Sequence, residues 1–224
     1  MPTYVVRLID CASKSKGGAG TASSGVGTDA AEVCSLIASW YRLITQKAGN
    51  GWTADVKWLT DPPNPVPGQD AGDALTINML ILFVLSPRDS VIKLHPKFSR
   101  SQIIPVENDP TTVGYTQTLT MSGSTVPAVS ISEVYVTRCR NLPGSEALTL
   151  KLARTGFHES MHNQLAKGDE MHRLSAGFGA AIATGTSPNG TDIQLMADKI
   201  GTFVPQWLDG FQAWITNDNS LNPK

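Results

Sequence analysis

The chain has 224 residues, 41% of them hydrophobic, so it is long enough to bury a core and is expected to form one domain. The net charge is -1 and the sequence pI is near 6.4, with Lys and Arg scattered along the chain. This leaves no basic field for a phosphate backbone, and nucleic acid is not expected as a partner. The three cysteines Cys11, Cys34 and Cys139 allow at most one disulfide and form no CxxC motif, which favours small buried side chains.

Two apolar segments bear on targeting. The run that starts at Tyr4 has no basic segment before it and no small-residue cleavage site after it, so it does not predict a secretory signal. The stretch 77–86 is shorter than the roughly 20 residues that cross a bilayer, and a buried strand is the better interpretation. No membrane span is expected. The lack of a predicted signal leaves open a cytoplasmic enzyme, a domain of a longer exported protein, or export without a signal.

The first part of the chain predicts a strand, a helix and then several strands. A β-branched run predicts a strand over 4–10, and the Gly/Ser/Ala-rich segment 13–27 predicts a loop. A helix capped by Thr28 or Asp29 should end before Gly49, because apolar residues recur at helical spacing between them. Further strands are expected at 54–59, 75–85, 102–106, 115–121 and 131–138.

The last third of the chain is expected to be mainly helical. Ser145 is a suitable N-cap for a helix over about 145–167, and apolar residues recur every three or four positions along it. Loops follow over 177–190, then an apolar stretch at 193–200 and a closing helix over 205–215. These elements predict a mixed α/β (α+β) fold in a single domain, 1–224, with a sheet lobe over about 1–167 and a small helical lobe over about 168–224.

One motif on the second predicted helix carries chemistry, the run His158-Glu159-Ser160-Met161-His162. Residues four apart lie on one helix face, so the imidazoles of His158 and His162 can bind one Zn²⁺ ion. Glu159 lies about 100° round the helix from His158, where a carboxylate can act as general base without ligating. Zinc would lower the pKa of a bound water towards about 7, and Glu159 would take up its proton.

The alternative for this motif is a surface helix with two solvated histidines. Only four histidines and six glutamates occur in the chain, so a chance His-Glu-x-x-His match is expected at a rate of roughly a few in a thousand. Both histidines also flank the apolar stripe of the helix instead of opposing it. The metal site is therefore the favoured interpretation.

The motif resembles that of the zincin metallopeptidases, and within them of the metzincins. The resemblance implies a largely parallel twisted sheet, an active-site helix, a third histidine after a helix-ending glycine, and a later methionine in a tight turn. Here Gly168 and His172 follow the motif, but six and ten residues after His162, where metzincins have three and six. His172 could reach the zinc only if the helix stopped first, because ten further helical residues span about 15 Å.

Several residues compete for the place of the third ligand. Lys167 and Gly168 favour a helix stop with the glycine left-handed, which would return His172 to the metal. Asp169, Glu170 and Asp192 remain alternative ligands; no glutamate follows Glu170, which excludes a glutamate ligand from a downstream helix.

Four further residues outside the motif are candidates for a role in the site. Met196 is the one methionine after His172, so it is either the Met-turn residue or a core residue of a short helix. His95 is interpreted as a loop residue without a metal role, and Tyr135 and Arg138 as strand residues.

Three functions follow from these residues. The first is a zinc metallopeptidase acting on a peptide or protein substrate, with zinc on His158, His162 and His172 and with Glu159 as general base. The second is a non-catalytic zinc module closed by a fourth protein ligand, which is less favoured because no cysteine lies near the motif. The third is a zinc hydrolase with a non-protein amide or a single protein as its substrate.

Overall fold

The computed structural model describes residues 1–12, 26–59, 77–92, 108–120, 123, 127–202, 204 and 206. The strands in this part of the chain are β1 (Thr3–Asp10), β2 (Thr53–Leu59), β3 (Met79–Val84), β4 (Gly114–Thr120) and β5 (Pro127–Tyr135). The helices are α1 (Ala30–Ala48), α4 (Val136–Asn141), α5 (Leu148–Leu165) and α6 (Gly190–Ala197). Short 3-10 helices occur at Gly27–Asp29, Pro87–Asp89 and Asp169–Arg173.

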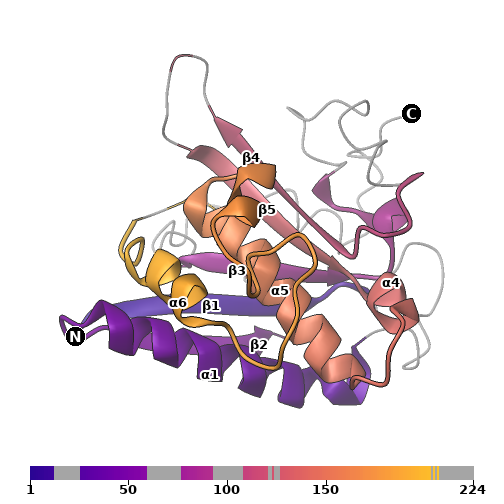
Figure 1. The fold of residues 1–224 in the computed structure, drawn as a ribbon, viewed down its shortest axis with the longest axis horizontal. Coiled ribbons are helices and arrows are strands. Elements are labelled where there is room, and N and C mark those ends of the chain that lie inside the picture. The colour runs from indigo at the N-terminus through magenta and orange to yellow at the C-terminus, as the bar shows by residue number, and fades with distance from the viewer. Residues whose placement is uncertain are drawn as a thin grey trace, which may run out of the picture.

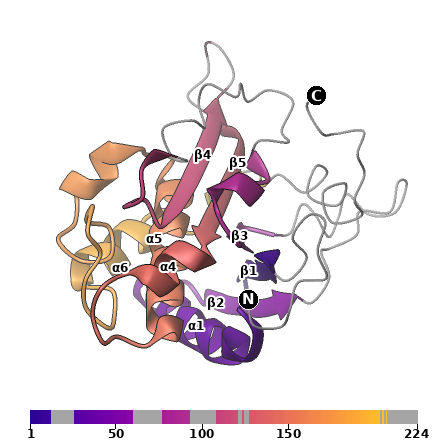
Figure 2. The same ribbon diagram turned by 90° about the vertical axis from the view of Figure 1, so that its right-hand side faces the viewer.

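The described strands form one twisted sheet with the order β2-β1-β3-β5-β4 (Figure 1). β1, β2, β3 and β5 run parallel, and β4 pairs antiparallel with β5 at one edge. α1, α5 and α6 lie on the same face of the sheet, as two perpendicular views show (Figures 1 and 2). The expected mixed α/β fold with a mostly parallel sheet is confirmed, while the division into two lobes stays a prediction.

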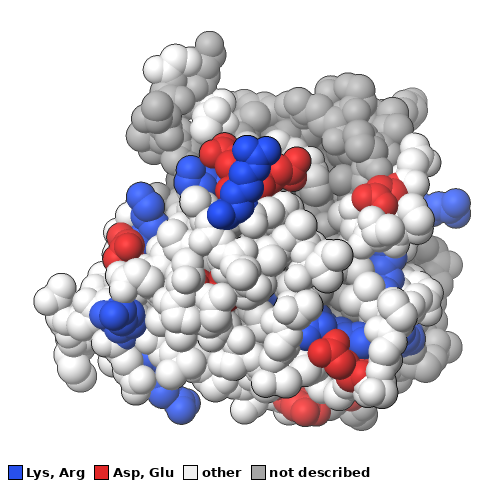
Figure 3. Space-filling model, in the orientation of Figure 1, with Lys and Arg blue, Asp and Glu red and all other residues white. Residues whose placement is uncertain are grey.

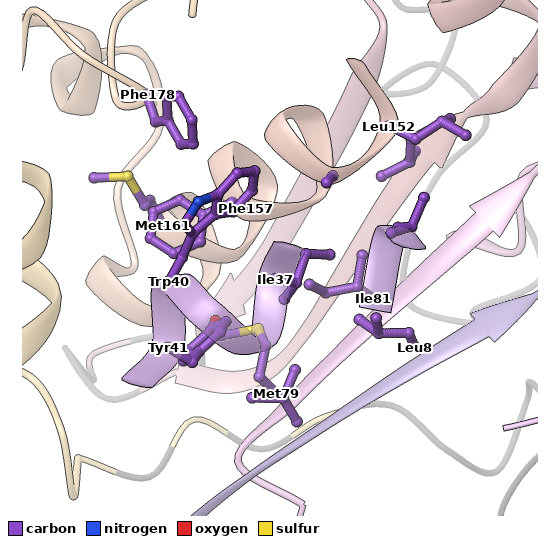
Figure 4. Close-up of a cluster of buried hydrophobic side chains, with 14 of the residues drawn as sticks. Leu8, Ile37, Trp40, Tyr41, Met79, Ile81, Leu152, Phe157, Met161 and Phe178 are labelled. Carbon is purple, nitrogen blue, oxygen red and sulfur yellow. The ribbon is translucent and has the colours of Figure 1, made fainter. Parts of the chain in front are cut away.

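The larger core lies between the sheet and its helices. α1 buries Val33, Ile37, Trp40 and Ile44, the apolar residues that recur at helical spacing along it. Trp40 meets Phe157 of α5 edge to face, and both rings contact Phe178 (Figure 4). Aromatic side chains from three segments therefore fix α5 against α1.

α5 is buried along almost its whole length, because it lies between the sheet, α1 and α6. Gly156 allows its close approach to the sheet, since a Cβ there would lie 3.4 Å from Ile81 Cγ2 and 3.5 Å from Phe83 Cζ. Polar side chains near its C-terminal end are buried too: the Gln164 amide donates to the carbonyl oxygens of Lys199 and Thr202. These contacts hold α5 in one position.

The helix boundaries at two places differ from the sequence-based expectation. The strand expected at 131–138 is wrong beyond Tyr135, where β5 ends and α4 begins. The predicted helix start at Ser145 is also wrong: α5 begins at Leu148, because both carboxylate oxygens of Glu146 bind the guanidinium of Arg154 outside the helix.

Of the other predicted elements, the first helix is confirmed, and several others lie largely or wholly outside the described residues. α1 is confirmed, although Asp29 at its N-cap makes no capping hydrogen bond. His95, the whole of the predicted strand 102–106 and nearly all of the closing helix 205–215 lie outside the described residues. Gln206, the one described residue within 205–215, forms an isolated parallel bridge with Ser130.

The described surface carries charges of both signs. In the view of Figure 3, Lys and Arg side chains lie among Asp and Glu side chains, with wide uncharged areas between them. No helix within the described ranges is long and apolar enough to span a membrane.

A buried glutamate lies on the sheet face opposite α5. Glu133 of β5 has no exposed surface, and its Oε1 accepts hydrogen bonds from the N–H groups of Val91 (2.6 Å) and Ile92 (3.2 Å). Its Oε2 accepts from the hydroxyls of Ser90 (2.6 Å) and Tyr135 (3.4 Å). Burial raises the pKa of Glu133 to about 7, and these hydrogen bonds only partly oppose that rise.

The Glu133→Gln variant should gain stability relative to the parent protein as the pH rises. The folded-state pKa of about 7 lies above the ordinary 4.5, so the stability contributed by the neutral acid is complete below pH 4.5 and is lost as the pH rises through 7. An amide fits the same partners without ionising, because its NH₂ can donate to the two hydroxyls. Between pH 5 and pH 8 we expect the variant to gain on the order of 2–3 kcal/mol over the parent in free energy of unfolding.

Urea denaturation of the zinc-free proteins at both pH values measures this gain. Glu32→Gln, at an exposed position on α1, is the control and should track the parent. A difference between Glu133→Gln and the parent that is equal at pH 5 and pH 8 would contradict the raised pKa.

Candidate metal centre

Three histidine rings converge beside the C-terminal end of α5. His158 and His162 lie one turn apart on this helix, and His172 lies in the 3-10 helix Asp169–Arg173. The Nε2 atom of His162 is 3.1 Å from that of His158 and 3.2 Å from that of His172. Among the described residues this trio is the one set of three or more His, Cys, Asp or Glu side chains whose ligand atoms lie within 4.8 Å of one another.

A left-handed residue turns the chain back towards His158 and His162. α5 ends at Leu165, and Ala166 adopts φ 51° and ψ 42°. The N–H of Lys167 then binds the carbonyl oxygen of His162, which closes the turn before His172 arrives. The expected helix stop is present, but the expectation that Gly168 would be the left-handed residue is wrong, since its φ is -79°.

The hydrogen bonds of two rings determine which nitrogens carry protons. The Nδ1 atom of His158 is 2.6 Å from the carbonyl oxygen of Phe178, and that of His162 is 2.7 Å from the carbonyl oxygen of Lys167. A carbonyl oxygen only accepts, so each Nδ1 must donate, and in a neutral ring the Nε2 then carries a lone pair. Burial lowers the pKa of His162 and lowers that of His158 to about 4, which favours the neutral form of both rings.

This arrangement fits zinc. Two lone pairs that face each other across 3.1 Å repel unless a cation lies between them. Nitrogen ligands bind zinc at about 2.0–2.1 Å in tetrahedral geometry, which separates two ligand nitrogens by about 3.3 Å. The two measured Nε2 separations are close to that value, and the Nδ1–H···O=C bonds orient the rings as zinc-bound histidines require.

Glu159 lies against the edge strand β4. The hydroxyl of Thr116 is within hydrogen-bonding distance of both the Glu159 Oε2 (2.8 Å) and its carbonyl oxygen (2.9 Å). Gly114 leaves the space for the side chain, since a Cβ there would be 2.6 Å from the Glu159 Oε1. Burial, aided by the nearby charge of Glu133, raises the pKa of Glu159 to about 8, against the effect of the Thr116 hydrogen bond.

The carboxylates considered as alternative ligands lie elsewhere or have other partners. Asp169 and Glu170 are exposed, and Glu170 pairs with Lys167 at 3.3 Å. Asp192 is fully buried and accepts hydrogen bonds from the loop before α6 and from the N-terminus of α6. None of the three belongs to the histidine cluster.

The remaining sequence-based candidates fall outside the cluster. Met196 lies within α6 and in the larger core, so the prediction that it forms a tight Met-turn is wrong and the core role applies. Tyr135 is buried in the smaller core, and Arg138 lies in α4, where its guanidinium donates to the carbonyl oxygen of Thr112.

Sequence reasoning missed the residues that surround the histidines and Glu159. A glycine at the start of an alternating strand signals close approach, which could have pointed to Gly114. Asn189 forms a capping box with Asp192, and this three-residue spacing, visible in the sequence, could have pointed to Asn189. The carbonyl groups of Phe178 and Lys167 have no signal in the sequence.

Comparison with known proteins identifies no relative of this chain. No profile of a known protein family, no curated protein and no solved structure matches this chain.

Proposed function

We propose that this chain is a zinc-dependent hydrolase, and specifically a metallopeptidase. The observation that carries the proposal is the convergence of the His158, His162 and His172 Nε2 atoms, with two of the rings held as Nδ1–H tautomers by carbonyl oxygens. These three side chains would hold the zinc. Glu159, the neighbour of His158 in the motif, supplies the acid–base group.

Each residue has a chemical task in this proposal. Zinc, when bound, supplies Lewis acidity that lowers the pKa of a water molecule and polarises the carbonyl of the bond to be cut. Glu159 takes up the proton that the water gives away and passes it to the leaving amine. Without metal, the pKa of about 8 leaves Glu159 mostly protonated at pH 7. A cation nearby would lower that pKa, so that the carboxylate is available to accept a proton at neutral pH. Thr116 orients the Glu159 carboxylate.

The sheet supports a peptide as the substrate. β4 is an edge strand within the described part of the fold, and its Thr116 lies beside Glu159. An extended peptide can add to such an edge through main-chain hydrogen bonds, which would bring its backbone close to Glu159. The parallel sheet with one antiparallel edge strand and the active-site helix also support the resemblance to metzincins.

A non-catalytic zinc module is the less favoured role. A structural site usually has four protein ligands, and the described residues bring three side chains together here. A three-ligand site leaves a coordination position for water and substrate.

Metal removal and a peptide library test the proposal together. The purified protein should cleave members of the library, lose this activity after treatment with a chelator, and regain it with one equivalent of zinc. Circular dichroism of the chelated protein controls for unfolding. Failure to cleave any peptide, together with cleavage of a non-protein amide, would replace the peptidase by another zinc hydrolase; zinc binding without hydrolysis of either would favour the non-catalytic module.

Gly114→Ala should reduce turnover without removing zinc. The added Cβ would lie 2.6 Å from the Glu159 Oε1 and 2.9 Å from the carbonyl oxygen of Glu133, so the Glu159 side chain must move. We expect turnover to fall by about 10- to 100-fold, because displacing a catalytic group by about 1 Å can lower the rate by up to about 100-fold. Metal analysis and steady-state kinetics measure both quantities.

The control for this variant is Gly190→Ala, at the first residue of α6, where an added Cβ has no heavy atom within 4 Å. This control should keep full activity and zinc. Unchanged turnover in Gly114→Ala would show that the position of Glu159 against β4 does not matter for catalysis.

A further inference from the structure

One buried carboxylate organises the loop that contacts the metal site. Asp192, in the first turn of α6, has no exposed surface. Its Oδ1 accepts hydrogen bonds from the Ser175 hydroxyl and from the Gly179 N–H at 3.0 Å. Its Oδ2 accepts from the N–H groups of Phe178 (2.8 Å) and Asn189 (2.9 Å). Both oxygens are thus satisfied by donors of the loop and of the start of α6.

The same peptide group connects Asp192 to a metal ligand. The carbonyl oxygen of Phe178 and the N–H of Gly179 belong to a single peptide unit. His158 donates its Nδ1–H to that carbonyl oxygen at 2.6 Å, while Asp192 accepts from that N–H at 3.0 Å. A charged acceptor on the N–H side polarises the peptide unit and strengthens the carbonyl oxygen as an acceptor. The chain of contacts runs from carboxylate through peptide to histidine.

The packing of the loop leaves the carboxylate little freedom. A Cβ at Gly177 would overlap the Asp192 carboxylate and the Asn189 amide. A Cβ at Gly179 would lie 2.9 Å from the Ser175 Cβ and 3.2 Å from the Asp192 Oδ1. The loop can therefore wrap the carboxylate only because these two positions are glycines.

The charge of Asp192 has no basic partner among the described residues, where the ion pairs involve other acids. A buried anion without a counter-charge is costly. A divalent cation on the histidine that is hydrogen-bonded to the same peptide would offset part of this cost.

We propose that Asp192 is a positioning residue for the zinc ligand His158, acting through the Phe178–Gly179 peptide. The inference rests on the proposed zinc site. In zinc proteins a carboxylate or carbonyl group commonly accepts from the far nitrogen of a ligand histidine, which fixes the ring and raises its basicity. Here the carboxylate acts one peptide further away, and it keeps the carbonyl oxygen in place for His158.

Asp192→Asn tests the proposal through zinc affinity. An amide must present its NH₂ to one of the two oxygen positions, and each of these faces a backbone N–H donor. The Phe178–Gly179 peptide should therefore shift, and zinc should bind about 10- to 100-fold more weakly in competition with a chromophoric chelator. Asp198→Asn, the same change at an exposed position just after α6, is the matched control and should keep the parental affinity.

Proton NMR of the zinc-loaded protein separates positioning from a general loss of stability. The Nδ1 proton of His158 should move upfield in Asp192→Asn, because its acceptor weakens. The Nδ1 proton of His162 is the internal control: it binds the carbonyl oxygen of Lys167 and should not move. A purely structural role of Asp192 would lower the unfolding midpoint but leave both resonances and the affinity unchanged, and that result would overturn the inference.

Two other variants, which keep the Asp192 carboxylate, cover the case in which Asp192→Asn does not fold. Ser175→Ala removes one hydrogen bond from the Asp192 carboxylate, and a several-fold loss of zinc affinity is expected. Gly177→Ala pushes on the carboxylate while keeping its charge, and Gly190→Ala, whose Cβ would meet no heavy atom within 4 Å, is its control. Parental affinity in both folded variants would overturn the inference, whereas a parent protein without zinc would instead overturn the proposed function.

Discussion

Glu159→Gln is expected to lower turnover by about 10²- to 10⁴-fold while one zinc stays bound, because the amide keeps the shape of the side chain but cannot accept the proton of the water. Thr116 can still donate to the amide oxygen, so the local structure should persist. Single-turnover kinetics on a peptide found with the parent, together with metal analysis, measures both effects.

The matched control for this prediction is Glu32→Gln, an exposed glutamate in the first turn of α1. It should cleave the same peptide at the parental rate. Turnover by Glu159→Gln within a few fold of the parent would exclude this residue as the general base, whatever metal the protein holds.

His172→Ala is expected to weaken zinc binding by more than about 100-fold, since even the loss of a group that only orients a ligand costs 10- to 100-fold. The variant leaves His158 and His162 on α5, and two imidazoles alone hold zinc weakly. Its fold should survive, because His172 is partly exposed and follows Met171, which lies in the core. Chelator competition measures the affinity, and thermal unfolding of the zinc-free variant checks the fold.

Arg173→Ala is the neighbouring control, because Arg173 is exposed and lies outside the histidine cluster. It should bind zinc like the parent. Undiminished affinity in His172→Ala would instead assign the third ligand to a carboxylate, for which Asp169 and Glu170 are the nearest candidates in sequence.

The parts of the site that local geometry determines could be predicted from the sequence. A four-residue spacing on a helix places His158 and His162 side by side whatever surrounds the helix. The apolar spacing of α1 likewise predicted which side chains it buries, because one helix face must meet the sheet.

The parts that depend on contacts between distant segments could not be predicted. His172 lies at the cluster because Ala166 adopts a left-handed conformation, although alanine does not favour it and Gly168 was the expected residue. Burial of Glu159 depends on β4, whose Thr116 lies 43 residues earlier in the chain. At α4 the β-branched residues after Tyr135 predict a strand, but tertiary contacts favour a helix.

The most direct test of the three-histidine zinc site is zinc X-ray absorption spectroscopy on the protein loaded with one equivalent of zinc. The account predicts a first shell of nitrogen and oxygen atoms at about 2.0–2.1 Å, with the outer-shell scattering of three imidazoles, and with one imidazole fewer in His172→Ala. A spectrum of the parent with two imidazoles or fewer, or no stoichiometric zinc binding at all, would contradict it.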